Sequence, residues 1–87
     1  MNIEKIYKRS FDNPLNEDGT RKESELLGEF EIIETLNEDH YTSQRLGVLI
    51  GSSKVYLIDE YEVTGLNGGS RFEVTELKSL TVRFLKA

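Results

Sequence analysis

The chain has 87 residues, of which 31% are charged and 37% hydrophobic, and its formal net charge is −5. This length and composition predict a single soluble domain over residues 1–87 and exclude a disordered or fibrous chain. Cysteine is absent, which excludes disulfides, thiolate metal sites and cysteine nucleophiles.

The N-terminal segment is typical of a strand and not of a targeting signal. Residues 3–11, IEKIYKRSF, offer Ile6, Tyr7 and Phe11 for burial in a first strand. The segment has no apolar core of signal-peptide length, and no run in the chain approaches the length of a membrane span. We therefore expect a cytoplasmic protein that does not contact a membrane.

The next segment, residues 12–22, predicts a loop. It holds the single proline of the chain together with Asn-Pro and Asp-Gly pairs, which favour turns. Its order of polar residues suggests a calcium-binding loop with Gly19 at the sixth position, but the first position then falls on Pro14, which has no side-chain oxygen. We expect a solvated turn, no metal and no cofactor.

Residues 23–37, ESELLGEFEIIETLN, fit a strand or a helix. A strand would place four apolar residues on one face with Glu34 interrupting them: Leu26, Phe30, Ile32 and Leu36. A helix could take Thr20 as its cap, but Gly28 costs about 1 kcal/mol in a helix interior. We favour the strand and keep a helix over residues 21–36, packed on an antiparallel sheet, as the alternative.

The second half of the chain predicts strands joined by tight turns. RLGVLI and KVYLIDEYEVTG flank a turn at 51–53, where Gly51 can adopt a positive φ. Residues 55–58, VYLI, are apolar on both faces, as in a central strand covered on both sides. An unbroken strand would then point Asp59 inward, so we expect a bulge that turns this carboxylate outward.

A second hairpin is expected around residues 66–70, before RFEVTEL and SLTVRFL. Closing it at Asn67–Gly68 would set Glu62 opposite Glu73, whereas closing it at Gly68–Gly69 would avoid that like-charge contact. Taken together, the elements predict a mainly β fold, either a small antiparallel barrel or a strongly bent sheet of five to six strands.

The acidic charge is concentrated in the first half. Residues 11–44 hold ten acids and two bases, for −8, whereas residues 1–10 carry +2 and residues 45–87 carry +1. An acidic face steers onto basic surfaces and disfavours direct binding to a phosphate backbone. We expect this face to bind a basic protein partner through six carboxylates: Glu25, Glu29, Glu31, Glu34, Glu38 and Asp39.

No arrangement of residues indicates an enzyme. His40 is the single histidine, and no activated-serine motif accompanies it. The glycines at 65–69 precede a strand, not the helix N-terminus that a phosphate loop needs. Aromatic residues near Arg71 and Arg83 leave a small nucleic-acid-binding barrel as one alternative.

In composition the chain is similar to the small acidic proteins that phages and other mobile elements use to block host enzymes, although no motif carries this similarity. The first hypothesis is a non-enzymatic protein that engages and inhibits a basic partner, such as a nucleic-acid-binding enzyme. A structural subunit that forms homo-oligomers through its strand edges is the second hypothesis.

Overall fold

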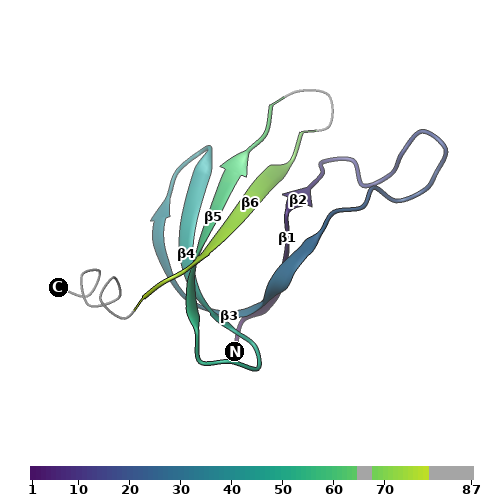
Figure 1. Cartoon of the computed structure of the whole chain (residues 1–87). Coiled ribbons are helices and arrows are strands. Elements are labelled where there is room, and N and C mark those ends of the chain that lie inside the picture. Colours follow the sequence, from purple (N-terminus) through teal and green to yellow (C-terminus); the bar gives the residue numbers. More distant parts are fainter. Residues whose placement is uncertain (65–67, 79–87) are drawn as a thin grey trace.

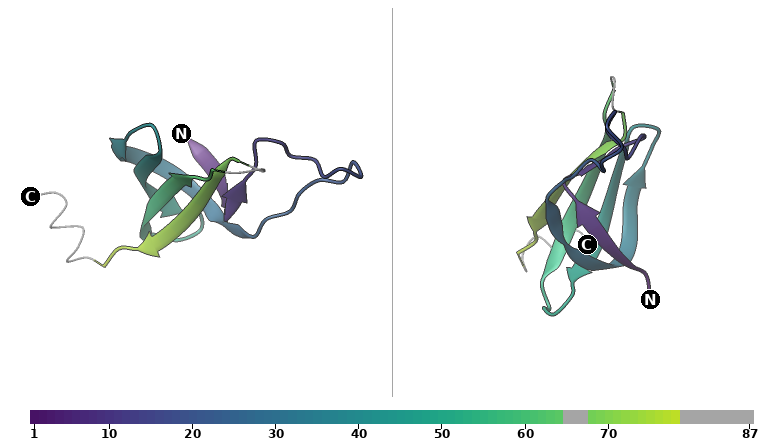
Figure 2. Two further views of the ribbon diagram at one scale, coloured as in Figure 1. Left: turned by 90° about the horizontal axis from the view of Figure 1, so that it is seen from above. Right: turned by 90° about the vertical axis from the view of Figure 1, so that its right-hand side faces the viewer.

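The computed structural model describes residues 1–64 and 68–78, which form one antiparallel sheet in the order β1-β3-β4-β5-β6-β2 (Figure 1). The six strands are β1 (Ile3–Tyr7), β2 (Arg9–Ser10), β3 (Leu26–Glu38), β4 (Thr42–Leu49), β5 (Val55–Glu62) and β6 (Ser70–Glu76). The sheet curls into a nearly closed barrel, which confirms the predicted mainly β fold (Figure 2).

The strand predicted within residues 23–37 is confirmed, because β3 covers most of that segment. The alternative helix over residues 21–36 is therefore wrong. Among the described residues there is no helix at all. No helix in these ranges is long and apolar enough to cross a membrane.

The barrel closes through its first strand, which changes partners at Lys8. The Lys8 amide donates to the Glu25 carbonyl over 2.7 Å, and the Lys8 carbonyl accepts from the Phe72 amide over 2.9 Å. Before this residue β1 pairs with β3, and after it β2 pairs with β6. One short segment thus joins the two ends of the sheet.

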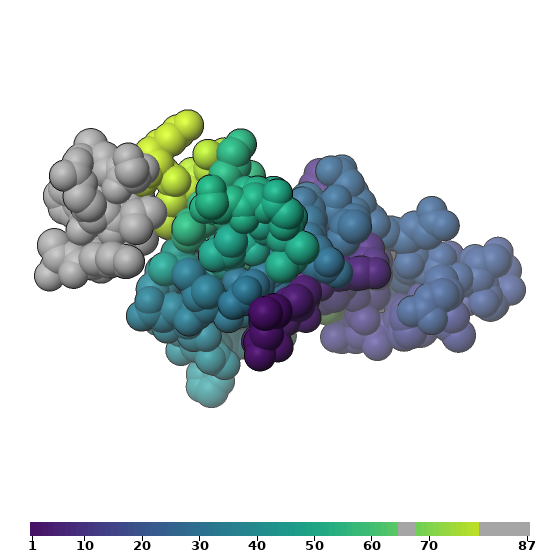
Figure 3. Space-filling model, turned by 90° about the horizontal axis from the view of Figure 1, so that it is seen from below, coloured from purple at the N-terminus to yellow at the C-terminus, as the bar shows by residue number. Residues whose placement is uncertain are grey.

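The loop between β2 and β3 extends away from the barrel (Figures 2 and 3). Leu15 pairs with Arg21 in an isolated bridge, and the Asn16 amide donates to the Thr20 carbonyl over 2.7 Å. Gly19 takes a φ of 87° at the tip. The predicted turn is confirmed, and it forms the end of a small hairpin.

A small apolar core fills one part of the barrel. Ile6, Phe30 and Ile58 are buried, and the Phe30 and Tyr56 rings meet edge to face at 5.4 Å. Gly47 makes room for them, because a Cβ at this position would lie 2.9 Å from Ile58 Cδ1. The core therefore depends on a residue without a side chain on β4.

Two register shifts in β3 explain how its apolar pattern is interrupted. Ile32 pairs with Gly47, and Glu34 then pairs with Leu46, so that Ile33 is an extra residue. A second shift between Thr35 and Asn37 leaves Leu36 extra as well. The expectation that Leu36 shares a face with Phe30 is wrong, because the bulges change the alternation of side chains.

Strand β5 is regular, and the expected bulge at Asp59 is wrong. Asp59 lies opposite Gln44 on β4 and Glu73 on β6, and it accepts a hydrogen bond of 2.9 Å from Gln44 Nε2. Its face is the outer one, because Ile58 next to it points into the core. The carboxylate is thus half-buried outside the barrel.

The two hairpins of the second half differ in how far they match the prediction. The turn at 51–53 is confirmed, with a φ of 85° at Gly51. In the β5–β6 hairpin, Glu62 pairs with Ser70 and Asp59 with Glu73, so both expected registers are wrong. The strand expected in SLTVRFL, residues 79–85, lies outside the described residues. The inward pair Ile58–Val74 sets this register, since a shift by one residue would turn every side chain to the other face.

Candidate functional site

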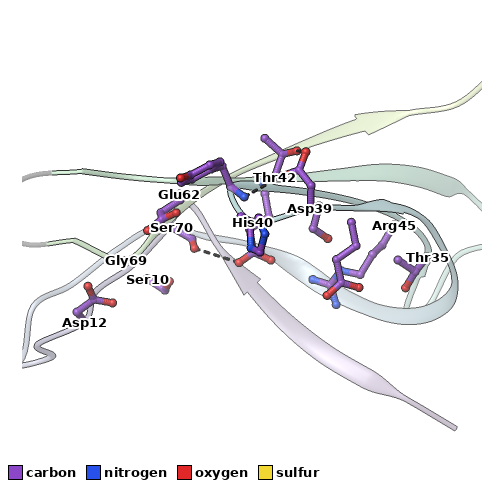
Figure 4. Close-up of a pocket in the computed structure, with 14 residues that line it drawn as sticks. Ser10, Asp12, Thr35, Asp39, His40, Thr42, Arg45, Glu62, Gly69 and Ser70 are labelled. Atoms are coloured by element: carbon purple, nitrogen blue, oxygen red, sulfur yellow. Dashed lines mark hydrogen bonds between the residues drawn. The ribbon is translucent and has the colours of Figure 1, made fainter.

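A cavity of about 590 Å³ opens at the end of the barrel where the β3–β4 turn meets the start of β6 (Figure 4). This volume lies in the range of ligand pockets. Its side chains are mostly polar. Five of the residues that line it are carboxylates: Asp12, Glu38, Asp39, Glu60 and Glu62.

This acidic cavity lies where the barrel does not close. On the side away from β4, the last backbone bond along β3 among the described residues runs from the Ile32 amide to the Asn2 carbonyl, over 2.8 Å. The later part of β3 contributes Thr35 to one wall of the cavity. Ser10 on β2 and Ser70 on β6 line the wall across from it (Figure 4).

Strand alternation brings the carboxylates into the barrel. On β5, the same period of two that directs Ile58 into the core directs Glu60 and Glu62 into the cavity. The pairs Glu38–Ser43 and Ser43–Glu60 then place three cavity residues side by side on neighbouring strands. The barrel interior therefore changes from apolar to acidic along β5.

The arginine of the cavity does not neutralise these acids. Arg45 Nη1 lies 2.7 Å from Glu4 Oε2 on β1, and the two side chains are 15% and 38% exposed. Glu4 is not a lining residue, so the arginine charge is balanced from outside the cavity. Ser70 Oγ donates to Glu60 Oε2 over 3.0 Å, which orients that carboxylate.

Asp39 organises the β3–β4 turn at the cavity rim. Its Oδ1 accepts from the backbone amides of Tyr41 and Thr42, each over 2.8 Å. These hydrogen bonds, and one from the Thr42 hydroxyl to Asp39 Oδ2, hold the pKa of Asp39 below its ordinary value of 3.8. The carboxylate is therefore ionised throughout the neutral pH range.

The six carboxylates expected to bind a partner are not on one face. Glu38 and Asp39 line the cavity. Three others lie on the outer surface of β3: Glu29, Glu31 and Glu34. Glu25 precedes β3 and is exposed. The first-half acidic block is thus divided between the cavity, the outside of the barrel and the loop.

Sequence reasoning missed Asp12, Glu60 and Glu62 as members of the site. The sequence contains a signal for two of them, because Glu60 and Glu62 continue the alternate positions of Tyr56 and Ile58 and so lie on the same face of the strand. It identifies them as cavity residues only when the face of β5 that points into the barrel is known. Asp12 follows β2 and reaches the cavity through barrel closure, for which the sequence offers no local pattern.

The described residues of the other candidate sites, for nucleic acid and for calcium, lie away from the acidic cavity. Tyr56 and Phe72 pack against the core, and Arg83 lies outside the described residues. In the tip of the 12–22 loop, the Asp18 carboxylate accepts from the Thr20 hydroxyl and amide, which lowers the pKa of Asp18. Within residues 1–64 and 68–78, no group of three histidine or carboxylate side chains is placed to hold a metal.

No protein-family model matches the chain, and neither a curated protein nor a solved structure matches it. The acidic cavity is a polar, negatively charged recess, open to solvent at a seam of the barrel, and it suits a cationic group.

Proposed function

We propose that this protein is a non-enzymatic binding protein that takes a cationic side chain of a basic partner into the acidic cavity. The observation that carries the proposal is the number of uncompensated charges: five carboxylates line the cavity, while its arginine is paired with Glu4. Opposite charge across an interface gives specificity and speeds association.

The cavity can complement a lysine or arginine in more than charge. Carboxylates accept strong, charge-assisted hydrogen bonds from ammonium and guanidinium groups. Glu60 is oriented by Ser70, and hydroxyls of Thr35 and Ser43 add further acceptors along the walls. A basic residue that enters this recess therefore exchanges water for several oxygen ligands.

The same chemistry supports a partner with a strongly basic surface. A protein with a basic cleft, such as a nucleic-acid-binding enzyme, presents lysine and arginine residues at high density. An acidic protein seated there would exclude the nucleic acid and so inhibit the enzyme. Such inhibition by steric exclusion needs no catalytic group in the small protein.

The test is a pull-down from host-cell extract with two baits. One is the wild-type chain, and the other, the cavity variant, carries Asp12→Asn, Glu38→Gln and Glu62→Gln. These three side chains are exposed, and none of them accepts a hydrogen bond from another described residue. The wild-type bait should retain a basic protein at low salt and release it at high salt, because salt screens exposed charges.

A second candidate function, homo-oligomerisation, rests on the free edge of β3. Beyond Ile32 this strand pairs with β4 alone among the described residues, and two apolar side chains protrude beside the edge. Ile33 is 51% exposed and Leu36 is 38% exposed. An unpaired strand edge with apolar neighbours is a template for a second copy.

Light scattering coupled to gel filtration tests this second candidate. If β3 edges join two copies, the wild-type chain should elute as a dimer, and the double variant Ile33→Lys, Leu36→Lys should elute as a monomer. Lysine on an edge strand opposes pairing by charge repulsion. A wild-type monomer at high protein concentration would contradict the oligomer hypothesis.

A further inference from the structure

A second cavity, of about 540 Å³, lies beside the acidic one and shares Ser10 with it. Its charge is of the opposite sign. Arg9, Arg21 and Lys22 line it, against one carboxylate, Glu23. The chain has a net charge of −5, so a recess lined by three cations is not expected from its overall composition.

Two of these cations share one aromatic ring. The Arg9 guanidinium carbon lies 4.7 Å from the Phe11 ring centroid, and Lys22 Nζ lies 5.5 Å from the same centroid. Cation–π contact favours each of these positions. Both side chains keep their positive charge, because the ring is neutral.

Hydrogen bonds fix the same side chains without neutralising them. Arg9 Nη2 donates to the Gly68 carbonyl over 2.7 Å, and Lys22 Nζ donates to the Asn13 carbonyl over 2.8 Å. Both acceptors are uncharged. Among the described residues, the ion pairs within 4.0 Å are Arg45–Glu4 and Lys54–Glu76, neither of which lies in this cavity.

The strand register places a fourth cation next to Arg9, although this residue is not part of the cavity lining. Arg9 on β2 lies directly opposite Arg71 on β6. Like charges in directly opposed positions of an antiparallel pair are destabilising. An anion bound beside Arg9 would reduce this repulsion.

We propose that this basic cavity binds the phosphate or pyrophosphate group of a small molecule. Guanidinium groups match the geometry of phosphate oxygens, and lysine adds a point charge. The volume leaves room for a group attached to the phosphate. The site is separate from the carboxylates of the proposed partner-binding cavity, so either proposal can fail without the other.

The test is a titration of the ¹⁵N-labelled full-length chain with sodium pyrophosphate, with sodium chloride adjusted to keep ionic strength constant. Amide signals of Arg9, Phe11, Lys22 and Ser24 should move and saturate. The double variant Arg21→Gln, Lys22→Gln should bind at least about tenfold more weakly. The control Lys54→Gln, which removes a charge in the 50–54 turn, should stay within about twofold of wild type.

Three results would overturn the proposal. One is the absence of saturable shifts, and another is equal affinity of the wild type and the double variant, which would indicate an adventitious ion only. The third comes from a parallel titration with an oligothymidine. Tighter binding of the oligothymidine than of pyrophosphate, with shifts extending to Arg71, would assign the surface to nucleic acid instead. A spectrum of the double variant with wild-type dispersion shows that the fold is intact.

Discussion

Tyr61 reports the electrostatics of the outer face of β5. The negative charge of Asp59 is the largest cause that raises the pKa of Tyr61 above 10.0, and partial burial and Glu73 add to it. The substitution Asp59→Asn should therefore lower the Tyr61 pKa toward its ordinary value, because the phenolate would no longer form beside that carboxylate. The measurement is a pH titration of the Tyr61 ring carbon by NMR.

The control for this prediction is Glu60→Gln. Glu60 is the sequence neighbour of Asp59, but it lines the cavity on the other face of β5. It should leave the Tyr61 pKa nearly unchanged. If Asp59→Asn has no effect, or if Glu60→Gln has the larger one, the assignment of faces along β5 is wrong.

For single residues, the sequence correctly predicted which side chains of β5 share a face. It did not predict which of the two faces points into the barrel. Asp59 does share a face with Leu57, as alternation implies, but that face is outside the barrel. The assumption that carboxylates avoid the interior led to the expected bulge. Here the interior holds Glu60 and Glu62 because an open cavity keeps them in contact with water.

At the scale of elements, closure of the barrel depends on Gly69. This residue has a φ of 83°, and a Cβ on it would overlap the Ser10 carbonyl oxygen on β2. Gly69→Ala should destabilise the fold by roughly 1–3 kcal/mol and separate β2 from β6. Hydrogen exchange of the Phe72 amide, which donates to the Lys8 carbonyl across this seam, should become faster.

Gly51→Ala is the matched control for the closure prediction. Gly51 has a similar φ of 85°, but a Cβ there meets nothing within 4 Å. Both alanines are placed at a similar positive φ, so both variants lose stability for that reason. The difference between their free energies of unfolding therefore measures the clash with Ser10. Equal losses of stability, with unchanged exchange at Phe72, would show that the seam does not depend on Gly69.

The strands themselves were largely predictable, but their registers were not. Alternation and turn residues located β1, β4 and β5, since these signals are local. The bulges at Ile33 and Leu36 depend on how β3 meets β4, and the β5–β6 register depends on the Ile58–Val74 pair. Contacts between distant residues decide such features, and no short window of sequence contains them.

For the whole molecule, counting charges predicted an acidic protein. It did not predict how the acidic residues are distributed between the cavity and the outer surface of the barrel. The count located the acidic excess in residues 11–44. Barrel closure then combined Glu38 and Asp39 with Glu60 and Glu62 from outside that block, and left Glu29 on the outer wall. Closure at Lys8 requires pairing with two strands at once, which is a property of the complete fold.

The measurement that tests the acidic cavity most directly compares two triple variants as baits in the same extract. The cavity variant carries Asp12→Asn, Glu38→Gln and Glu62→Gln, and the outer-face variant carries Glu29→Gln, Glu31→Gln and Glu34→Gln. Each removes three negative charges, so net charge is matched. We predict that the outer-face variant retains the salt-sensitive basic partner and that the cavity variant loses it. Loss by the outer-face variant alone, or equal retention by both, would contradict binding of the partner in the acidic cavity.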